Sequence, residues 1–335
     1  MTWLPTILRT RNNLIWATRY AISSSIGKAY ENCRVDHRLP QEPDYVASLV
    51  LHGTKVIYHT WHEILRPYGF EVKMAGIYCH QTPKVHYNGM EHNSCEIGDI
   101  LWCHIHYDND GYAYRNALLL QAKICLQEPF DILTHEKDQY LLYNRWPEFE
   151  YVNMHDLVQK KRRVRPAAPR RGAQFLLIRP FLLTELWSDV SIMNDIQPMG
   201  VSISINPLVC HTDLGIELVK TLTSLSGDAF DDKETSSKDT DWSRVIWDLI
   251  SASSTKAFRR TRSGFDSAPR LTGARLEELD GTHSIPSYSE PIIFREFFDG
   301  SIKRENHRDF KKGIWKDTGD PGLSTILIET RSREQ

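Results

Sequence analysis

Three polar side chains in the middle of the chain have the types and spacing that hydrolysis of a phosphodiester bond requires. Asp99 lies among the apolar residues of one expected strand, and Gln121 and Lys123 lie two positions apart in the next. Residues two apart in a strand share one face of the sheet. If these strands pair, a carboxylate, an amide oxygen and an ammonium group meet at one place.

Such a group of side chains suits catalysis by a hard divalent cation, Mg²⁺ or Mn²⁺. Mg²⁺ takes oxygen ligands, keeps several waters and uses only one or two carboxylates. We expect Asp99 to be the main ligand, with the side-chain carbonyl of Gln121 and the backbone carbonyl of Ala122 completing the coordination. The cation would polarise the phosphoryl group and lower the pKa of a bound water. Lys123 would orient that water or stabilise the charge of the transition state.

The elements expected around these residues alternate between helix and strand. Apolar spacing, with Pro43 at the start and Pro67 at the end, predicts a first helix that Gly53 divides into two shorter ones. Asn109, Asp110 and Gly111 predict a chain reversal between the second and third strands. The expected order is helix, three strands, helix and strand, at residues 44–66, 70–80, 95–107, 115–126, 135–146 and 148–152.

This arrangement resembles the PD-(D/E)XK nuclease superfamily, whose core is the restriction-endonuclease-like α/β fold. The resemblance rests on Asp99, on its spacing to the next strand, and on the tripeptide Gln121-Ala122-Lys123. The tripeptide is similar to the Q-x-K element of the Mrr-like branch. Gln121 stands where the superfamily usually has an acid, which removes one negative charge from the site.

Two further features of the superfamily have counterparts in the flanking helices. Gln139 and Tyr143 form a Q-x-x-x-Y pattern that looks like the motif of RecB-like nucleases, and they lie one helical turn apart. The resemblance implies that they reach the site or a phosphate of bound nucleic acid, although Tyr143 also suits core packing. The superfamily places an acid on the helix before the first strand. Glu63 is our first candidate for that catalytic and metal-binding acid, and Glu42 is the second.

A run of basic residues follows this expected core. Residues 158–172 contain no acid, and their prolines break any long helix, which predicts an exposed linker. Its side chains would contact phosphates with strong salt dependence, the alternative being a solvated linker. The candidate nucleic-acid contacts are Lys160, Lys161, Arg162, Arg163 and Arg165, and a second candidate cluster comprises Arg259, Arg260 and Arg262.

Composition limits the class of protein. The 335 residues are 41% hydrophobic and 25% charged, as is ordinary for globular chains, and the net charge of −2 provides no general attraction for nucleic acid. No apolar stretch is long enough to span a bilayer, so we expect no membrane partner. Six cysteines without a C-x-x-C pair indicate reduced thiols and a cytoplasmic location. The spacing of His59, His62 and Glu63 matches no zinc-hydrolase motif, and no P-loop or G-x-S-x-G sequence occurs.

The expected organisation has four parts. Residues 1–41 form a basic arm or a helix that packs on the core, 42–155 the nuclease core, 156–173 the basic linker, and 174–335 an accessory α+β region. In the accessory region, residues 174–183, 291–298 and 323–330 have strand character, and residues 214–225 and 242–258 have helical character.

We therefore expect a metal-dependent nuclease that acts on nucleic acid, DNA rather than RNA. By analogy it would serve antiviral or mobile-element defence, as a homodimer or with a defence-system partner. Two alternatives remain open: a non-catalytic nucleic-acid-binding protein that retains the fold, which Gln121 permits, and an interaction or scaffold protein.

Overall fold

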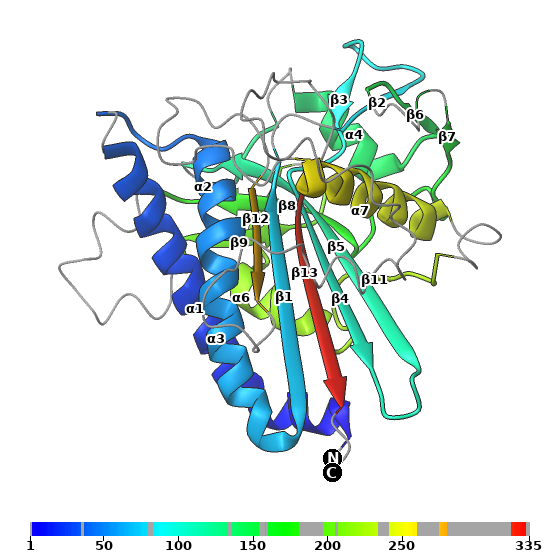
Figure 1. Cartoon of the computed structure of the whole chain (residues 1–335). Helices are drawn as coiled ribbons and strands as arrows, with labels where there is room; N and C mark the ends of the chain where they lie inside the picture. Colours follow the sequence, from blue (N-terminus) through cyan, green and yellow to red (C-terminus); the bar gives the residue numbers. More distant parts are fainter. Residues whose placement is uncertain are drawn as a thin grey trace.

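The described residues of the computed structural model cover most of the chain. They are residues 2–34, 37–79, 83–126, 128–132, 136–153, 158, 160–180, 197–204, 207–233, 241–259, 275–279 and 323–332. Together they form a mixed α/β protein (Figure 1).

A mixed β-sheet forms the centre of the described structure. Its strands are β1 (Phe70–Tyr78), β4 (Ile100–Tyr107), β5 (Ala113–Ile124), β8 (Ala173–Ile178), β9 (Met199–Ser202), β10 (Thr212–Asp213), β11 (Asp228–Ala229), β12 (Arg275–Leu279) and β13 (Ser324–Ser332). Eight of them lie in the order β10-β9-β8-β5-β4-β13-β1-β12, and β11 pairs with the first half of β5. The strands β4 and β5 form the expected antiparallel hairpin, and β8 runs parallel to the second half of β5.

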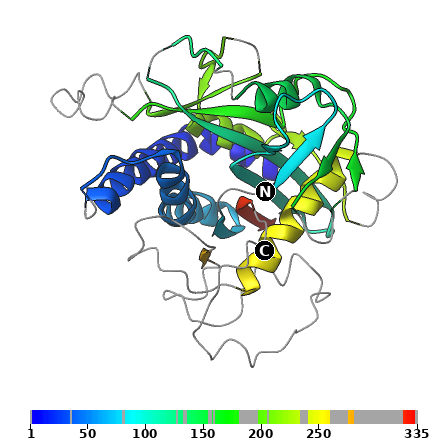
Figure 2. The same cartoon turned by 90° about the horizontal axis from the view of Figure 1, so that it is seen from above.

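Helices cover both faces of this sheet (Figure 2). One face packs against α1 (Trp3–Arg34), α2 (Glu42–Ser48), the π-helical turn η1 (Leu49–Gly53), α3 (Thr54–Leu65) and α6 (Leu214–Thr221). The other packs against α4 (Lys137–Arg145) and α7 (Asp241–Arg259). The expected division of the first helix at Gly53 is thus observed, with η1 between its halves, and the N-terminal segment is a helix that packs on the core. Within the described ranges, no helix has both the length and the apolar character needed to cross a membrane.

A second, smaller sheet lies beside α4. It contains β2 (Lys84–Tyr87), β3 (Cys95–Glu96), β6 (Phe149–Tyr151) and β7 (Lys161–Arg162), in the order β3-β2-β6-β7. The expectation that residues 148–152 close the core is therefore wrong. The strand that runs parallel to β5 is β8, which follows the expected linker. β6 pairs instead with β2 and β7.

The expected strand over 95–107 is interrupted. β3 ends at Glu96, β4 begins at Ile100, and residues 97–99 form a bend between them. Gly98 makes the bend possible, because a Cβ there would lie 2.7 Å from Leu119 Cδ1 and 3.0 Å from the Tyr143 hydroxyl. Asp99 therefore lies just before β4 and not inside a strand.

The last described strand lies in the middle of the sheet. β13 pairs antiparallel with β1 and parallel with β4, so it separates two strands of the expected nuclease core. Leu327 packs into the core under α4 and α7, whereas Ile326 and Ile328 pack into the core under α1 and α3. The central sheet thus crosses the expected boundary between core and accessory region. Helices α6 and α7 agree with the helical signals there, and residues 291–298 lie outside the described residues.

Candidate active site

The first part of the site is a carboxylate held between two strands. The Asp99 N–H donates to the carbonyl of Leu120 at 2.8 Å, which fixes the end of the bend against β5. In return, Asp99 Oδ2 accepts hydrogen bonds from the Gln121 side-chain amide and, at 2.8 Å, from the Ala122 backbone N–H. The structure thus brings together Asp99 and the tripeptide on β5, as the sequence predicted.

The ammonium group of the site belongs to Lys123 and points to the start of α4. Lys123 Nζ lies 3.2 Å from Glu136 Oε1, and both residues are almost completely buried. Glu136 is the N-cap residue of α4, so this ion pair joins the helix to β5. Burial alone would lower the pKa of Lys123, but the carboxylates of Glu42, Glu136 and Asp99 raise it. Lys123 is therefore held as a cation.

The acid contributed by the N-terminal helices is Glu42, our second candidate. Glu42 is the first residue of α2 and is only partly exposed. The start of α2 is fixed by Asp44, which accepts two hydrogen bonds from the Arg38 guanidinium and one from the Gln41 N–H. This cap holds Glu42 against the β5 side of the sheet, where it faces Lys123.

Glu63, the first candidate, does not reach the site. It lies in the last turn of α3, and its exposed side chain forms a long ion pair, 3.8 Å, with Arg66. Helix α3 packs along β1, so its end lies away from the N-terminus of α2. The periodicity of 44–66 identified the helix but did not show which of its ends faces β5.

A further carboxylate, Glu96, lies beside Asp99. Alternation along an unbroken strand would place these two residues on opposite faces of the sheet. The bend at 97–99 breaks the alternation, and the Glu96 side chain shares a hydrogen bond with Asp99. Glu96 is thus a member of the site that sequence reasoning missed. Gly98 was the one available signal, because a glycine inside a strand pattern marks a bulge or a bend.

The carboxylates of the site raise one another's pKa. Burial raises the pKa of Asp99 well above its ordinary value, and the neighbouring Glu42 and Glu96 raise it further. Burial, together with repulsion from Glu96 and Glu136, raises the pKa of Glu42 to about 7, against the opposing effect of Lys123. Lys123 thus compensates the negative charge at this place only in part, and such perturbed carboxylates are common in binding and catalytic sites.

Gln121 supplies an unsatisfied acceptor at the same place. Its side chain is 1% exposed, and Oε1 has no hydrogen-bond partner among the described residues. A buried amide oxygen without a partner costs free energy unless a ligand binds it. Together with Asp99, this oxygen fits a hard cation that retains water ligands. No group of three or more His, Cys, Asp or Glu side chains in the described part of the chain has a metal-binding arrangement, so such a cation would depend on one or two carboxylates and the amide.

Tyr143 supports the site from behind. Its side chain is fully buried, and its hydroxyl donates to the carbonyl of Ile97 at 2.9 Å. The tyrosine of the Q-x-x-x-Y pattern therefore holds the bend before Asp99 and does not lie on a surface open to nucleic acid. Gln139, one turn earlier on α4, is partly exposed.

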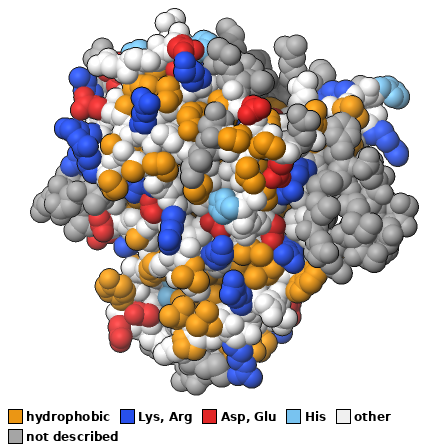
Figure 3. Space-filling model, turned by 180° about the vertical axis from the view of Figure 1, so that it is seen from behind, with side chains coloured by type: hydrophobic (Ala, Val, Ile, Leu, Met, Phe, Trp, Pro, Cys, Tyr) orange, Lys and Arg blue, Asp and Glu red, His pale blue; other side chains and the backbone are white. Residues whose placement is uncertain are grey.

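The basic residues after the core differ in their surroundings. Arg162 lies on β7 and binds the Asp248 carboxylate of α7, with Nε 2.7 Å from Oδ2. Lys161 lies 3.7 Å from Glu148 Oε1. The other three candidates of this run, Lys160, Arg163 and Arg165, are exposed. Arg260 and Arg262 lie outside the described residues. On the face shown in Figure 3, basic and acidic side chains are interspersed with apolar groups and do not form a continuous basic region.

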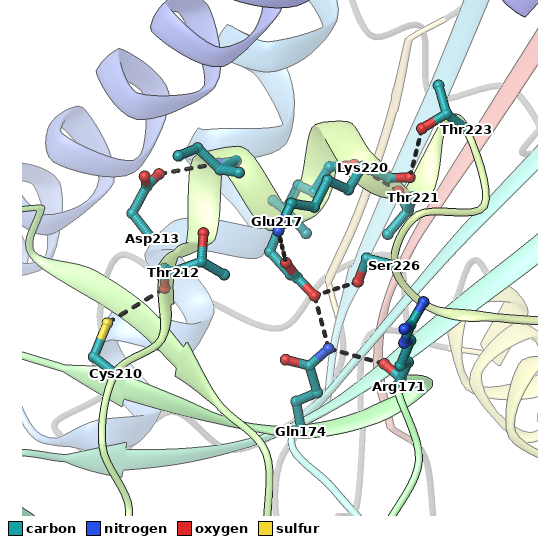
Figure 4. Close-up of polar contacts among 12 residues, drawn as sticks. Arg171, Gln174, Cys210, Thr212, Asp213, Glu217, Lys220, Thr221, Thr223 and Ser226 are labelled. Carbon is teal, nitrogen blue, oxygen red and sulfur yellow. Dashed lines mark hydrogen bonds and ion pairs between the residues drawn. The ribbon is translucent and has the colours of Figure 1, made fainter.

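A buried carboxylate elsewhere in the protein provides a contrast. Glu217 on α6 accepts hydrogen bonds from Gln174 of β8 at 2.8 Å and from the Ser226 hydroxyl, and it lies 3.2 Å from Lys220 (Figure 4). Every partner named is a donor, so this network compensates the charge and joins α6 to the sheet. Asp99, in contrast, lies among other acids.

No protein-family model, curated protein or solved structure matches the chain.

Proposed function

We propose that the protein is a metal-dependent nuclease that hydrolyses phosphodiester bonds, with DNA as the expected substrate. The observation that carries this proposal is the meeting of Asp99, Gln121 and Lys123 at one place in the sheet, with Glu42 facing Lys123. The finer fold assignment, a restriction-endonuclease-like core, belongs to the same proposal. The hairpin β4–β5, helix α4 and parallel strand β8 follow one another in the order that this fold requires, with β13 inserted beside β4.

Asp99 and Gln121 Oε1 would hold Mg²⁺ or Mn²⁺, as the unsatisfied amide oxygen and the mutually repelling carboxylates suggest. When bound, the cation would polarise the phosphoryl group and acidify a coordinated water. Asp99 is already oriented by its two hydrogen bonds to β5, so its position does not depend on flexible loops. Such preorganisation is what a catalytic site requires.

Lys123 and Glu42 would provide the proton and charge chemistry. Lys123 stays cationic because three carboxylates surround it, so its ammonium can donate hydrogen bonds to phosphate oxygens as negative charge develops. Glu42 has a pKa near 7 and can accept a proton from the attacking water at neutral pH. Glu136 balances Lys123 and keeps it near β5.

Cleavage by the purified full chain tests this proposal. Supercoiled plasmid, linear duplex and RNA of the same sequence are incubated with Mg²⁺ or Mn²⁺, and with EDTA as the metal-free control. We expect cleavage only with the cation, and a loss of about a hundredfold or more in D99N and K123M. The matched control is E63Q, an acid outside the site, which should retain wild-type activity.

Each alternative outcome has a distinct meaning. If the protein shifts DNA on a gel but never cuts it, the non-catalytic binding function replaces the nuclease. If it neither cuts nor binds any of the substrates, the interaction or scaffold function replaces both. If D99N cleaves as wild type does, the cleavage occurs at another site in the protein.

A further inference from the structure

The bend before β4 brings a second acid to the candidate metal site. Glu96 ends β3, where it pairs with Lys84 of β2, and the bend at 97–99 turns its side chain toward Asp99. Two contacts with α4 hold this segment. The Tyr143 hydroxyl donates a hydrogen bond to the Ile97 carbonyl. Before β3, the Asp138 carboxylate accepts hydrogen bonds from the backbone N–H groups of Glu91, at 3.0 Å, and His92, at 2.9 Å. The position of Glu96 is thus fixed by packed elements.

Asp99 and Gln121 each have an oxygen that receives no hydrogen bond from β5. Both hydrogen bonds from β5 to Asp99 end on Oδ2, so neither of these donors binds Oδ1. Gln121 Oε1 is buried beside the same carboxylate without a partner among the described residues. An acceptor this well buried, on a side chain whose amide N–H binds Asp99, points to a cation as the missing ligand.

We propose that Glu96 is the second carboxylate ligand of the divalent cation and replaces the acid that Gln121 removes from β5. This inference rests on the proposed function, because it assigns a further ligand to that metal site. The resulting set is two carboxylates, one amide oxygen and waters, as Mg²⁺ prefers. Lys123 offsets only part of the charge of the two acids, since its ammonium is bound to Glu136.

Titration of the full chain with Mn²⁺ alone, followed by calorimetry, tests this assignment without any cleavage assay. The variants are E96Q, D99N and the matched control E91Q. Glu91 is an exposed acid that pairs with Lys137, and its backbone N–H keeps the bond to Asp138 after the substitution. We expect E96Q to weaken Mn²⁺ binding by about tenfold or more, and E91Q to change it by less than about twofold.

Two results would overturn the inference, and they differ in what they say about function. If E96Q binds Mn²⁺ as wild type does while D99N loses binding, Glu96 is no ligand and the proposed nuclease stands. If wild type binds no Mn²⁺, the metal-dependent function fails as well. Thermal unfolding verifies that each variant folds. Should E96Q fail to fold, Glu96→Asp keeps the charge but shortens the side chain, and unchanged Mn²⁺ affinity in that variant also refutes the assignment.

Discussion

Ending the chain after residue 322 is expected to unfold the whole central sheet. The truncation removes β13, which lies between β1 and β4 and is hydrogen-bonded to both. If residues 174–335 were a separate accessory domain, a chain that ends at residue 322 would keep the fold and the metal site of the core. The structure predicts the opposite, because the two halves of the sheet lose the strand that joins them.

The size of the effect follows from what β13 and the residue before it bury. Four apolar side chains are nearly inaccessible to solvent: Leu323, Ile326, Leu327 and Ile328. Burial of each contributes about 1.5–3 kcal/mol, so the truncation removes about 6–12 kcal/mol. A typical domain has a total stability of about 5–15 kcal/mol, so the loss is comparable to the whole. The point variant Leu327→Ala should cost about 2–5 kcal/mol.

Urea unfolding followed by circular dichroism measures both variants. The fragment 1–322 should show no cooperative transition, and Leu327→Ala should shift the midpoint without changing the slope. The controls are a chain that lacks only residues 333–335, beyond β13, and Ser332→Ala at the end of the strand, which should remain within about 0.5 kcal/mol of wild type. A fragment 1–322 that unfolds like the full chain would refute the single-sheet argument.

Three further predictions concern the groups that position the site and the core. Tyr143→Phe should lower the free energy of unfolding by about 1–2 kcal/mol and weaken Mn²⁺ binding, because the bend before β4 loses its buried hydrogen bond. Urea unfolding measures the first effect and calorimetry the second, and wild-type values in both would contradict the positioning role of Tyr143. Burial lowers the pKa of His104 to about 3 and of His106 to about 4, so both stay neutral in the folded protein where the unfolded chain would protonate them below about pH 6.5. The free energy of unfolding should therefore fall by roughly 2 kcal/mol per histidine between pH 7 and pH 5, and equal stability at both pH values would refute this. Asp44→Asn should displace the start of α2 and with it Glu42, and so lower the cleavage rate at least tenfold. The free energy of unfolding should fall by about 1–2 kcal/mol. Wild-type cleavage in this variant would show that the cap is not needed.

Local patterns in the sequence determined most elements near the site. The apolar strand signals and the turn residues between them predicted the β4–β5 hairpin, and that hairpin brings Asp99 to the tripeptide on β5. The side chains involved are close in sequence, so short-range signals specify their meeting. The helices α4, α6 and α7 were likewise predicted, and α1 was one of the two alternatives for residues 1–41.

The choice between Glu42 and Glu63 depended on tertiary packing. Glu42 lies just before one stretch of helical pattern and Glu63 near its end, and periodicity does not show which end of a helix meets a distant strand. The cap between Arg38 and Asp44 and the packing of α3 along β1 place Glu42 in the site. Glu96 was missed for a related reason, because strand alternation holds only where the strand is unbroken.

The position of β13 was decided by long-range pairing. Its sequence predicted a strand at 323–330, but nothing in the pattern says that this strand pairs with residues more than two hundred positions earlier. Strand pairing uses backbone groups that every residue carries, so the partner is chosen by the packing of both faces and not by a local signal. The sequence thus determined the chemistry available between Asp99 and Lys123, whereas the tertiary structure decided which other acids join it and that a single sheet supports it.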